Sequence, residues 1–78
     1  MNYDLAIMAL EGLARAPLSV RNDEGECTLE GSPAAFKELA RLCLLLGGVQ
    51  NAEDAFELTP GVHVTADSPA VRLQLRVE

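Results

Sequence analysis

Two cysteines and one histidine are the residues in this chain whose side chains could carry out nucleophilic catalysis. Cys27, Cys43 and His63 are far apart in the sequence, but a Cys–His pair is set by the fold and not by spacing. Both cysteines follow the apolar phase of their surroundings, whereas His63 alternates with Val62 and Val64 in the polar phase. We therefore expect small buried thiols, an exposed histidine and a protein that is not an enzyme. A small enzyme that uses one of the cysteines stays open as an alternative.

The same residues make a poor metal site. A structural zinc ion takes four nitrogen or sulfur ligands at short spacings, and this chain has no CxxC pair and a single histidine. Gly31 precedes a helix start, as in phosphate-binding loops, but neither GxxxxGK[ST] nor GxGxxG is present. We expect no cofactor and no metal, and we interpret Ser32 and Pro33 as the N-cap and the first residue of a helix.

Carboxylates form the densest charged group in the chain. They fall on an expected hairpin turn and its second strand, and on a later polar connection that could extend the same surface. A turn open to water is a poor place for a catalytic carboxylate pair. We interpret the group as an acidic surface that binds a protein partner, and a solvated surface without a partner is the alternative. Its members are Asp23, Glu24, Glu26, Glu30, Glu53, Asp54 and Glu57.

Length and charge restrict the class of protein. The 78 residues suffice for one small domain over residues 1–78, and 12 acidic against 6 basic side chains give a net charge of −6. Such a chain is unsuited to nucleic acid or to an anionic membrane. The apolar run at residues 5–10 is far shorter than the roughly 20 residues of a membrane span, and Asp4 and Glu11 flank it. We expect a cytoplasmic protein.

Hydrophobic periodicity predicts two helices and four strands in the order α-ββ-α-ββ. This order indicates an α+β fold, with an antiparallel sheet of about four strands and both helices packed on one face of it. The expected ranges are 4–16 (helix), 18–30 (β-hairpin), 33–46 (helix), 56–65 (extended, with a turn or bulge at residues 59–61) and 70–78 (strand).

The expected first helix is apolar over more than half of its circumference. Ile7 and Leu10 lie beside its main apolar stripe, so either a sheet and a helix cover both sides or these two residues meet another chain. Chains of this size fold with a narrow margin of stability, which association would widen. A homodimeric structural or accessory subunit is therefore the alternative function. The expected core stripe is Leu5, Met8, Ala9, Leu13 and Ala16.

Two stretches carry a resemblance to a known family. LEGSPAAFKELARLCLLLG at residues 29–47 and LTPGVHVTADSPAVRLQLRV at residues 58–77 follow one another as a glycine-led helix with an L-A-x-L core, an L-x-P-G and a late S-P before a final strand. Over residues 18–77 the chain resembles a small immunity-protein family of bacterial polymorphic toxin systems. The resemblance implies a non-catalytic cytoplasmic protein that neutralises a cognate toxin. An acidic inhibitor suits a basic toxin domain.

Overall fold

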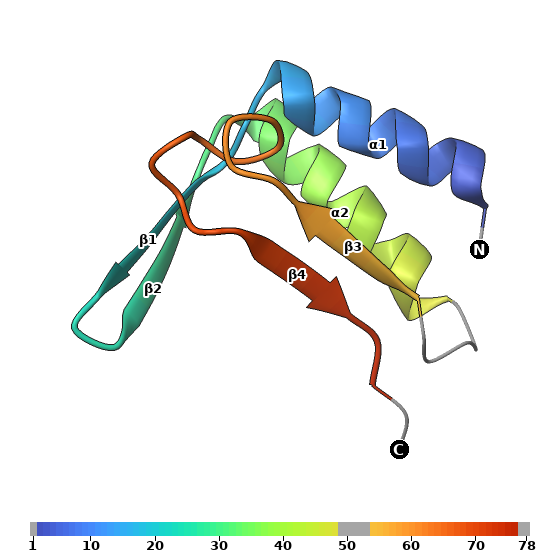
Figure 1. The fold of residues 1–78 in the computed structure, drawn as a ribbon. Coiled ribbons are helices and arrows are strands. Elements are labelled where there is room, and N and C mark those ends of the chain that lie inside the picture. Colours follow the sequence, from blue (N-terminus) through green and yellow to red (C-terminus); the bar gives the residue numbers. More distant parts are fainter. Residues whose placement is uncertain (1, 49–53, 77–78) are drawn as a thin grey trace.

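The computed structural model describes residues 2–48 and 54–76 as two helices and four short strands (Figure 1). This confirms the α+β class and the order α-ββ-α-ββ. Val77 and Glu78 of the expected last strand lie outside the described residues. The elements are α1 (Tyr3–Arg15), β1 (Ser19–Asp23), β2 (Glu26–Glu30), α2 (Pro33–Gly47), β3 (Ala55–Leu58) and β4 (Val71–Gln74).

The prediction of one four-stranded sheet is wrong. β1 pairs antiparallel with β2, and β3 pairs antiparallel with β4, as two separate two-stranded sheets. The expected extended segment breaks because β3 ends at Leu58 and the chain turns at once. The N–H groups of Val62 and His63 both donate to the carbonyl of Thr59 at 3.0 Å. Gly61 has a φ of 82°, a backbone conformation open to glycine at little cost.

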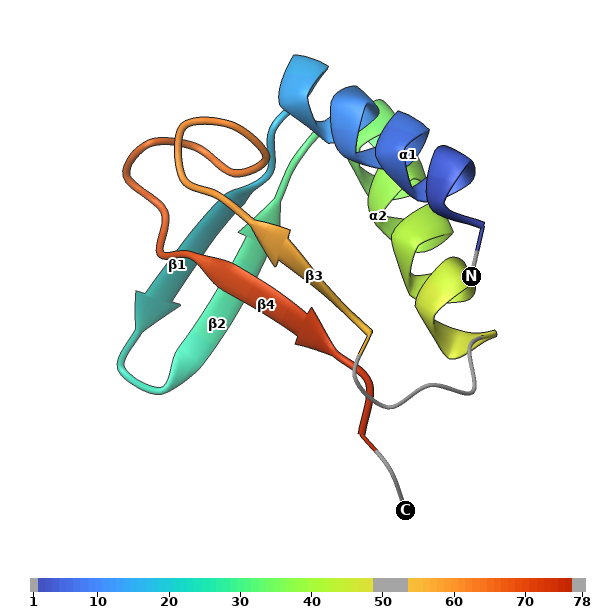
Figure 2. The same ribbon diagram turned by 45° about the vertical axis from the view of Figure 1, so that its right-hand side comes forward.

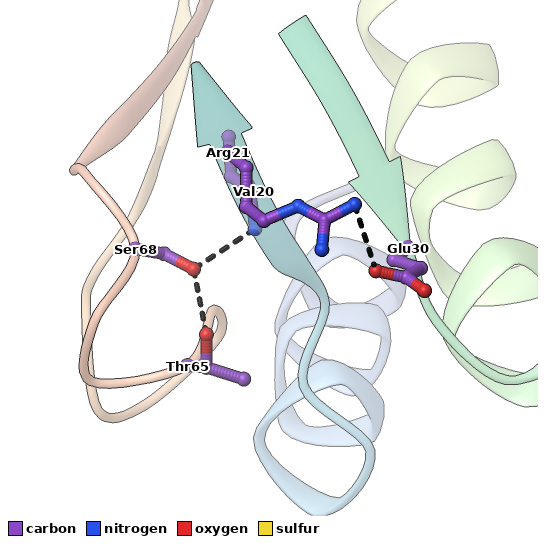
Figure 3. A network of polar contacts seen from close by, with 5 residues as sticks. All are labelled: Val20, Arg21, Glu30, Thr65 and Ser68. Atoms are coloured by element: carbon purple, nitrogen blue, oxygen red, sulfur yellow. Dashed lines mark hydrogen bonds and ion pairs between the residues drawn. The ribbon is translucent and has the colours of Figure 1, made fainter. Parts of the chain in front are cut away.

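The loop between β3 and β4 occupies the edge of β1 that a third strand would need. The N–H of Leu18 donates to the carbonyl of His63 at 3.1 Å, and the N–H of Thr65 donates to the carbonyl of Leu18 at 2.8 Å. The N–H of Val20 then donates to the side-chain Oγ of Ser68 at 2.9 Å (Figure 3). Loop backbone and one serine side chain thus occupy the start of this edge, at Leu18 and Val20, where β3 or β4 would otherwise have to pair.

Local signals start α2 at the predicted residue and end it one residue later than predicted, at Gly47. Ser32 Oγ accepts a hydrogen bond from the N–H of Ala35 at 3.1 Å, and Pro33 is the first helical residue. At the other end, the N–H of Gly48 donates to the carbonyl of Leu44 at 3.1 Å. The stretch that begins at Gly31 is thus a capped helix start, in which the serine hydroxyl serves a free backbone N–H.

One buried cluster joins both helices with β1 and β3, and half-buried residues of β4 pack against it. β2 contributes no buried residue, so Cys27 and Leu29 are exposed although their alternation with polar residues predicts a buried face. Figures 1 and 2 show α1 and α2 side by side and apart from the projecting β1–β2 hairpin. The core residues are Ala6, Ala9, Leu13, Leu18, Val20, Ala35, Leu42, Leu46, Phe56, Leu58 and Val64.

The buried face of α1 differs from the expected stripe. Leu5 and Met8, predicted to be core residues, are 49% and 62% exposed, whereas Ala9 and Leu13 are buried as predicted. Small residues bring the backbone of α1 close to its neighbours, and an added Cβ on Gly12 would lie 2.2 Å from Glu38 Oε2. The larger apolar side chains are thereby left on the flank of the helix. The buried residues of α1 are Ala6, Ala9, Gly12 and Leu13.

Candidate functional site

The β1–β2 turn carries three exposed carboxylates. Glu24 and Gly25 form a two-residue turn with φ values of 50° and 87°, so both adopt the left-handed conformation of a type I′ hairpin. Asp23 and Glu26 are directly opposite one another in the last pair of the ladder. Like charges at such positions destabilise a hairpin. The acidic tip, defined as Asp23, Glu24 and Glu26, is therefore an arrangement that folding alone does not favour.

The acidic tip has no basic ion-pair partner among the described residues. Within residues 2–48 and 54–76, no Lys or Arg forms an ion pair with any of its three carboxylates. Figures 1 and 2 both place this turn at an extreme of the molecule, away from the helices. The tip therefore presents concentrated negative charge to solvent and to any molecule that approaches from that side.

The other acidic residues of the expected surface have partners. Glu30 lies 3.4 Å from Arg21 in an ion pair (Figure 3), and Glu57 forms an ion pair with Arg72, its cross-strand neighbour. Asp54 Oδ1 accepts a hydrogen bond from the hydroxyl of Tyr3 at 3.3 Å.

The expected acidic surface thus has two locations in the fold. Asp54 directly precedes β3 and Glu57 lies in it, and both views of the ribbon separate β3 from the β1–β2 turn. Glu53 lies outside the described residues. The structure therefore brings together only the acidic tip, with Glu30 at the other end of the same strand.

Ser68 fixes the base of the β1–β2 hairpin to the neighbouring loop. Thr65 Oγ1 lies 2.7 Å from both Ser68 Oγ and Asp67 Oδ1. Because a carboxylate only accepts, Thr65 donates to Asp67, and Ser68 must donate to Thr65. Ser68 Oγ can then accept a hydrogen bond from the N–H of Val20. Each donor in this series of three hydrogen bonds therefore has one acceptor. The hydrogen bond from Thr65 holds the pKa of Asp67 below its ordinary value of 3.8.

The residues considered for catalysis have different surroundings from those predicted. His63 is half-buried, against the prediction of an exposed residue, and its Nδ1 accepts the backbone N–H of Thr59 at 3.1 Å. Cys27 and Cys43 are exposed free cysteines, so the prediction that they are buried is wrong. No group of three metal-binding side chains occurs in the described part of the chain. His63 thus closes the turn that begins at Thr59. The alternation of Val62, His63 and Val64 could not reveal this role.

A groove runs between α1 and α2, and Leu5 and Met8, which the sequence pattern assigned to the core, are among the residues that line it. Its volume is about 670 Å³. Leu44, beside it, is 77% exposed, the largest exposed fraction among the large apolar residues that are described. Glu38 lies over Gly12 and forms an ion pair with Arg41. The lining residues are Leu5, Met8, Glu11, Arg15, Glu38, Arg41, Leu44 and Leu45.

Ile7 and Leu10, the expected self-association residues, do not line this groove. Ile7 is 52% exposed, whereas Leu10 is half-buried and packs against the core. With 3.6 residues per turn, Ile7 lies about half a turn away from Leu5. The sequence signal that could have located the groove is the alanine and glycine spacing of α1, because small residues mark the side of closest helix packing.

Comparison with protein-family models, with curated proteins and with solved structures gives no match for this chain. Neither helix within the described ranges has the length and apolar content of a membrane-spanning segment. The acidic tip and the α1–α2 groove are therefore the two candidate functional surfaces of the described residues.

Proposed function

We propose that this chain is a non-catalytic binding protein that holds a basic protein partner through the acidic tip of the β1–β2 hairpin. The observation that carries the proposal is the like-charge pair Asp23–Glu26 beside Glu24, three carboxylates without an ion pair in the described part of the chain. A hairpin gains nothing from this arrangement in isolation. A cationic surface would compensate it on binding.

Electrostatics would act mainly on the rate of association. A net charge of −6 and a projecting tip attract a cationic partner over roughly a Debye length, about 8–10 Å at physiological salt. Exposed ion pairs at the rim of an interface add little affinity each, so the contact also needs apolar surface. Leu29, 46% exposed on the second strand of the same hairpin, provides some of it.

The resemblance to immunity proteins of bacterial polymorphic toxin systems suggests the class of partner. On this proposal the partner is a basic toxin domain, such as a nuclease, and the chain neutralises it in the cytoplasm. The paired carboxylates of Glu30, Asp54 and Glu57 would contribute less than the tip, because binding must first compete with their existing contacts.

An affinity capture with a matched control tests the proposal. The pure protein and a variant with Asp23, Glu24 and Glu26 changed to lysine are immobilised, and lysate of the source cells is passed over both at low salt. We expect one basic protein to be retained stoichiometrically by the parent, to be released by salt and to be lost on the variant. A second control reverses Asp54, Glu57 and Asp67, which changes the net charge equally. Equal retention by parent and tip variant would refute the proposed site.

Self-association through the first helix is a second candidate function, as in a structural or accessory subunit. The observation in its favour is Ile7, which is 52% exposed on α1 near Tyr3, itself 61% exposed. Leu10 is half-buried, so it would contribute only part of its surface. The solution mass of the parent and of Ile7→Lys tests this candidate, and a dimer that Ile7→Lys leaves intact would contradict it.

A further inference from the structure

Charge is divided unequally between the helices and the rest of the chain. The two helices contain three acidic residues and three basic residues, so they carry no net charge. The whole net charge of −6 therefore belongs to the hairpins, loops and termini. The six helical charges are Asp4, Glu11, Arg15, Lys37, Glu38 and Arg41.

The α1–α2 groove combines exposed apolar side chains with charges of both signs. Met8 and Leu44, one from each helix, are 62% and 77% exposed, and both line the groove. Exposed apolar residues are ordinary when single, but two of this size line the same groove from facing helices, together with Leu5. Four charged side chains also line it, and they are Glu11, Arg15, Glu38 and Arg41.

We propose that the α1–α2 groove is a two-fold symmetric interface between two copies of this chain. Two bodies of charge −6 repel one another, and the neutral helix pair is the face on which they meet with least repulsion. A two-fold axis places the same patch on both sides of the interface. A patch with acidic and basic groups, such as Glu11 and Arg15, can then form ion pairs with its own copy. A strongly basic partner would instead place positive charge against the arginines of the groove.

The dimensions of the helix pair indicate a weak dimer. Helices of 13 and 15 residues are roughly 20 Å long at 1.5 Å per residue, and a pair of helices is about 20 Å wide. Two such faces bury on the order of 1,000 Å² in total, near the lower limit of specific interfaces. We therefore expect a dissociation constant in the micromolar range. This interface is independent of the acidic tip, which lies outside the helix pair.

Analytical ultracentrifugation of the full chain tests the interface. The parent, Leu44→Lys and Met8→Lys are measured with reductant from about 5 to about 500 µM, a range that brackets a micromolar equilibrium. Reductant prevents a disulfide between the exposed cysteines of two copies. We expect a monomer–dimer equilibrium for the parent and a dissociation constant raised about tenfold or more in each groove variant, as at a central interface position.

Ile7→Lys is the matched control, because Ile7 is 52% exposed on the same helix but outside the groove. We expect this variant to dimerise like the parent. A parent that stays monomeric over the whole range would overturn the proposal. A dimer that Ile7→Lys disrupts and Leu44→Lys does not would also overturn it, in favour of the opposite flank of α1. Variants of the acidic tip should dimerise normally, so failure of one proposal leaves the other testable.

Discussion

The side-chain hydroxyl of Ser68 accepts a hydrogen bond from the backbone N–H of Val20 at 2.9 Å, and it thereby joins two hairpins that share no strand pairing. Ser68 is 7% exposed and Val20 is 5% exposed, so water does not readily replace either partner. The contact substitutes for the backbone carbonyl that a neighbouring strand would supply. It is one of the contacts that set the position of the hairpin that bears the acidic tip.

Removal of the Ser68 hydroxyl should destabilise the fold. Ser68→Ala leaves the buried N–H of Val20 without an acceptor, which costs about 1–3 kcal/mol of the free energy of unfolding. Urea denaturation of parent and variant measures the loss, with Ser68→Thr as the control that retains the hydroxyl. A Ser68→Ala variant as stable as the parent would show that this hydrogen bond has no net effect.

Asp67 should contribute to stability above about pH 4 and lose that contribution in stronger acid. The hydrogen bond from Thr65 lowers its pKa in the folded state from 3.8, so the folded state binds its proton less tightly than the unfolded state does. The contribution is therefore complete above about pH 4 and is lost as pH falls through the lowered pKa. NMR titration of the Asp67 carboxyl measures this pKa, and Thr65→Val should raise it toward 3.8. An unchanged titration in Thr65→Val would contradict the assignment of the cause.

The tip turn should be open to stabilisation at Glu24. Glu24 has a φ of 50°, and only glycine and, to a lesser degree, asparagine and aspartate adopt this region readily. Glu24→Asn produces the Asn-Gly sequence that favours a type I′ turn, and we expect about 0.5–1 kcal/mol of added stability by thermal denaturation. Gly25→Ala is the opposite control, because Gly25 has a φ of 87° and a Cβ there meets no atom within 4 Å. A loss of stability in the Gly25→Ala variant would therefore report backbone strain alone.

A charge reversal in the tip should raise stability while it weakens binding. Asp23→Lys faces Glu26 and turns a repulsive cross-strand pair into an attractive one, worth about 0.2–1 kcal/mol. Glu57→Lys, which faces Arg72, is the mirror-image control and should lose a similar amount. Denaturation gives both values. A destabilised Asp23→Lys variant would mean that the like-charge pair does not cost stability, and it would remove the main support for a binding role of the tip.

Local chemistry made much of the secondary structure predictable from the sequence. Ser32 and Pro33 fix the start of α2, Gly25 supplies a turn residue of the first hairpin, and alternation places Phe56 and Leu58 on one buried side of β3. Each of these depends on neighbours within a few residues. The order α-ββ-α-ββ and the α+β class follow from them.

The candidate surfaces were only partly predictable. The acidic tip is a local feature, because Asp23 and Glu26 are two residues on either side of one short turn. The groove is not a local feature, because it depends on which flank of α1 meets α2. Leu5 and Met8 have the spacing of core residues, but close packing at Gly12 directs the small side inward and leaves these two at the surface.

The order of the elements, the capped start of α2 and the charged hairpin turn are predictable from the sequence, because short-range hydrogen bonds and backbone preferences act within a few residues. Three features became evident only in the folded chain: the strands form two sheets, Asp54 and Glu57 lie apart from the acidic tip, and one flank of α1 is buried. The physical reason is that these outcomes depend on contacts between distant segments. The hydrogen bond from Val20 to Ser68, 48 residues apart, is one of them.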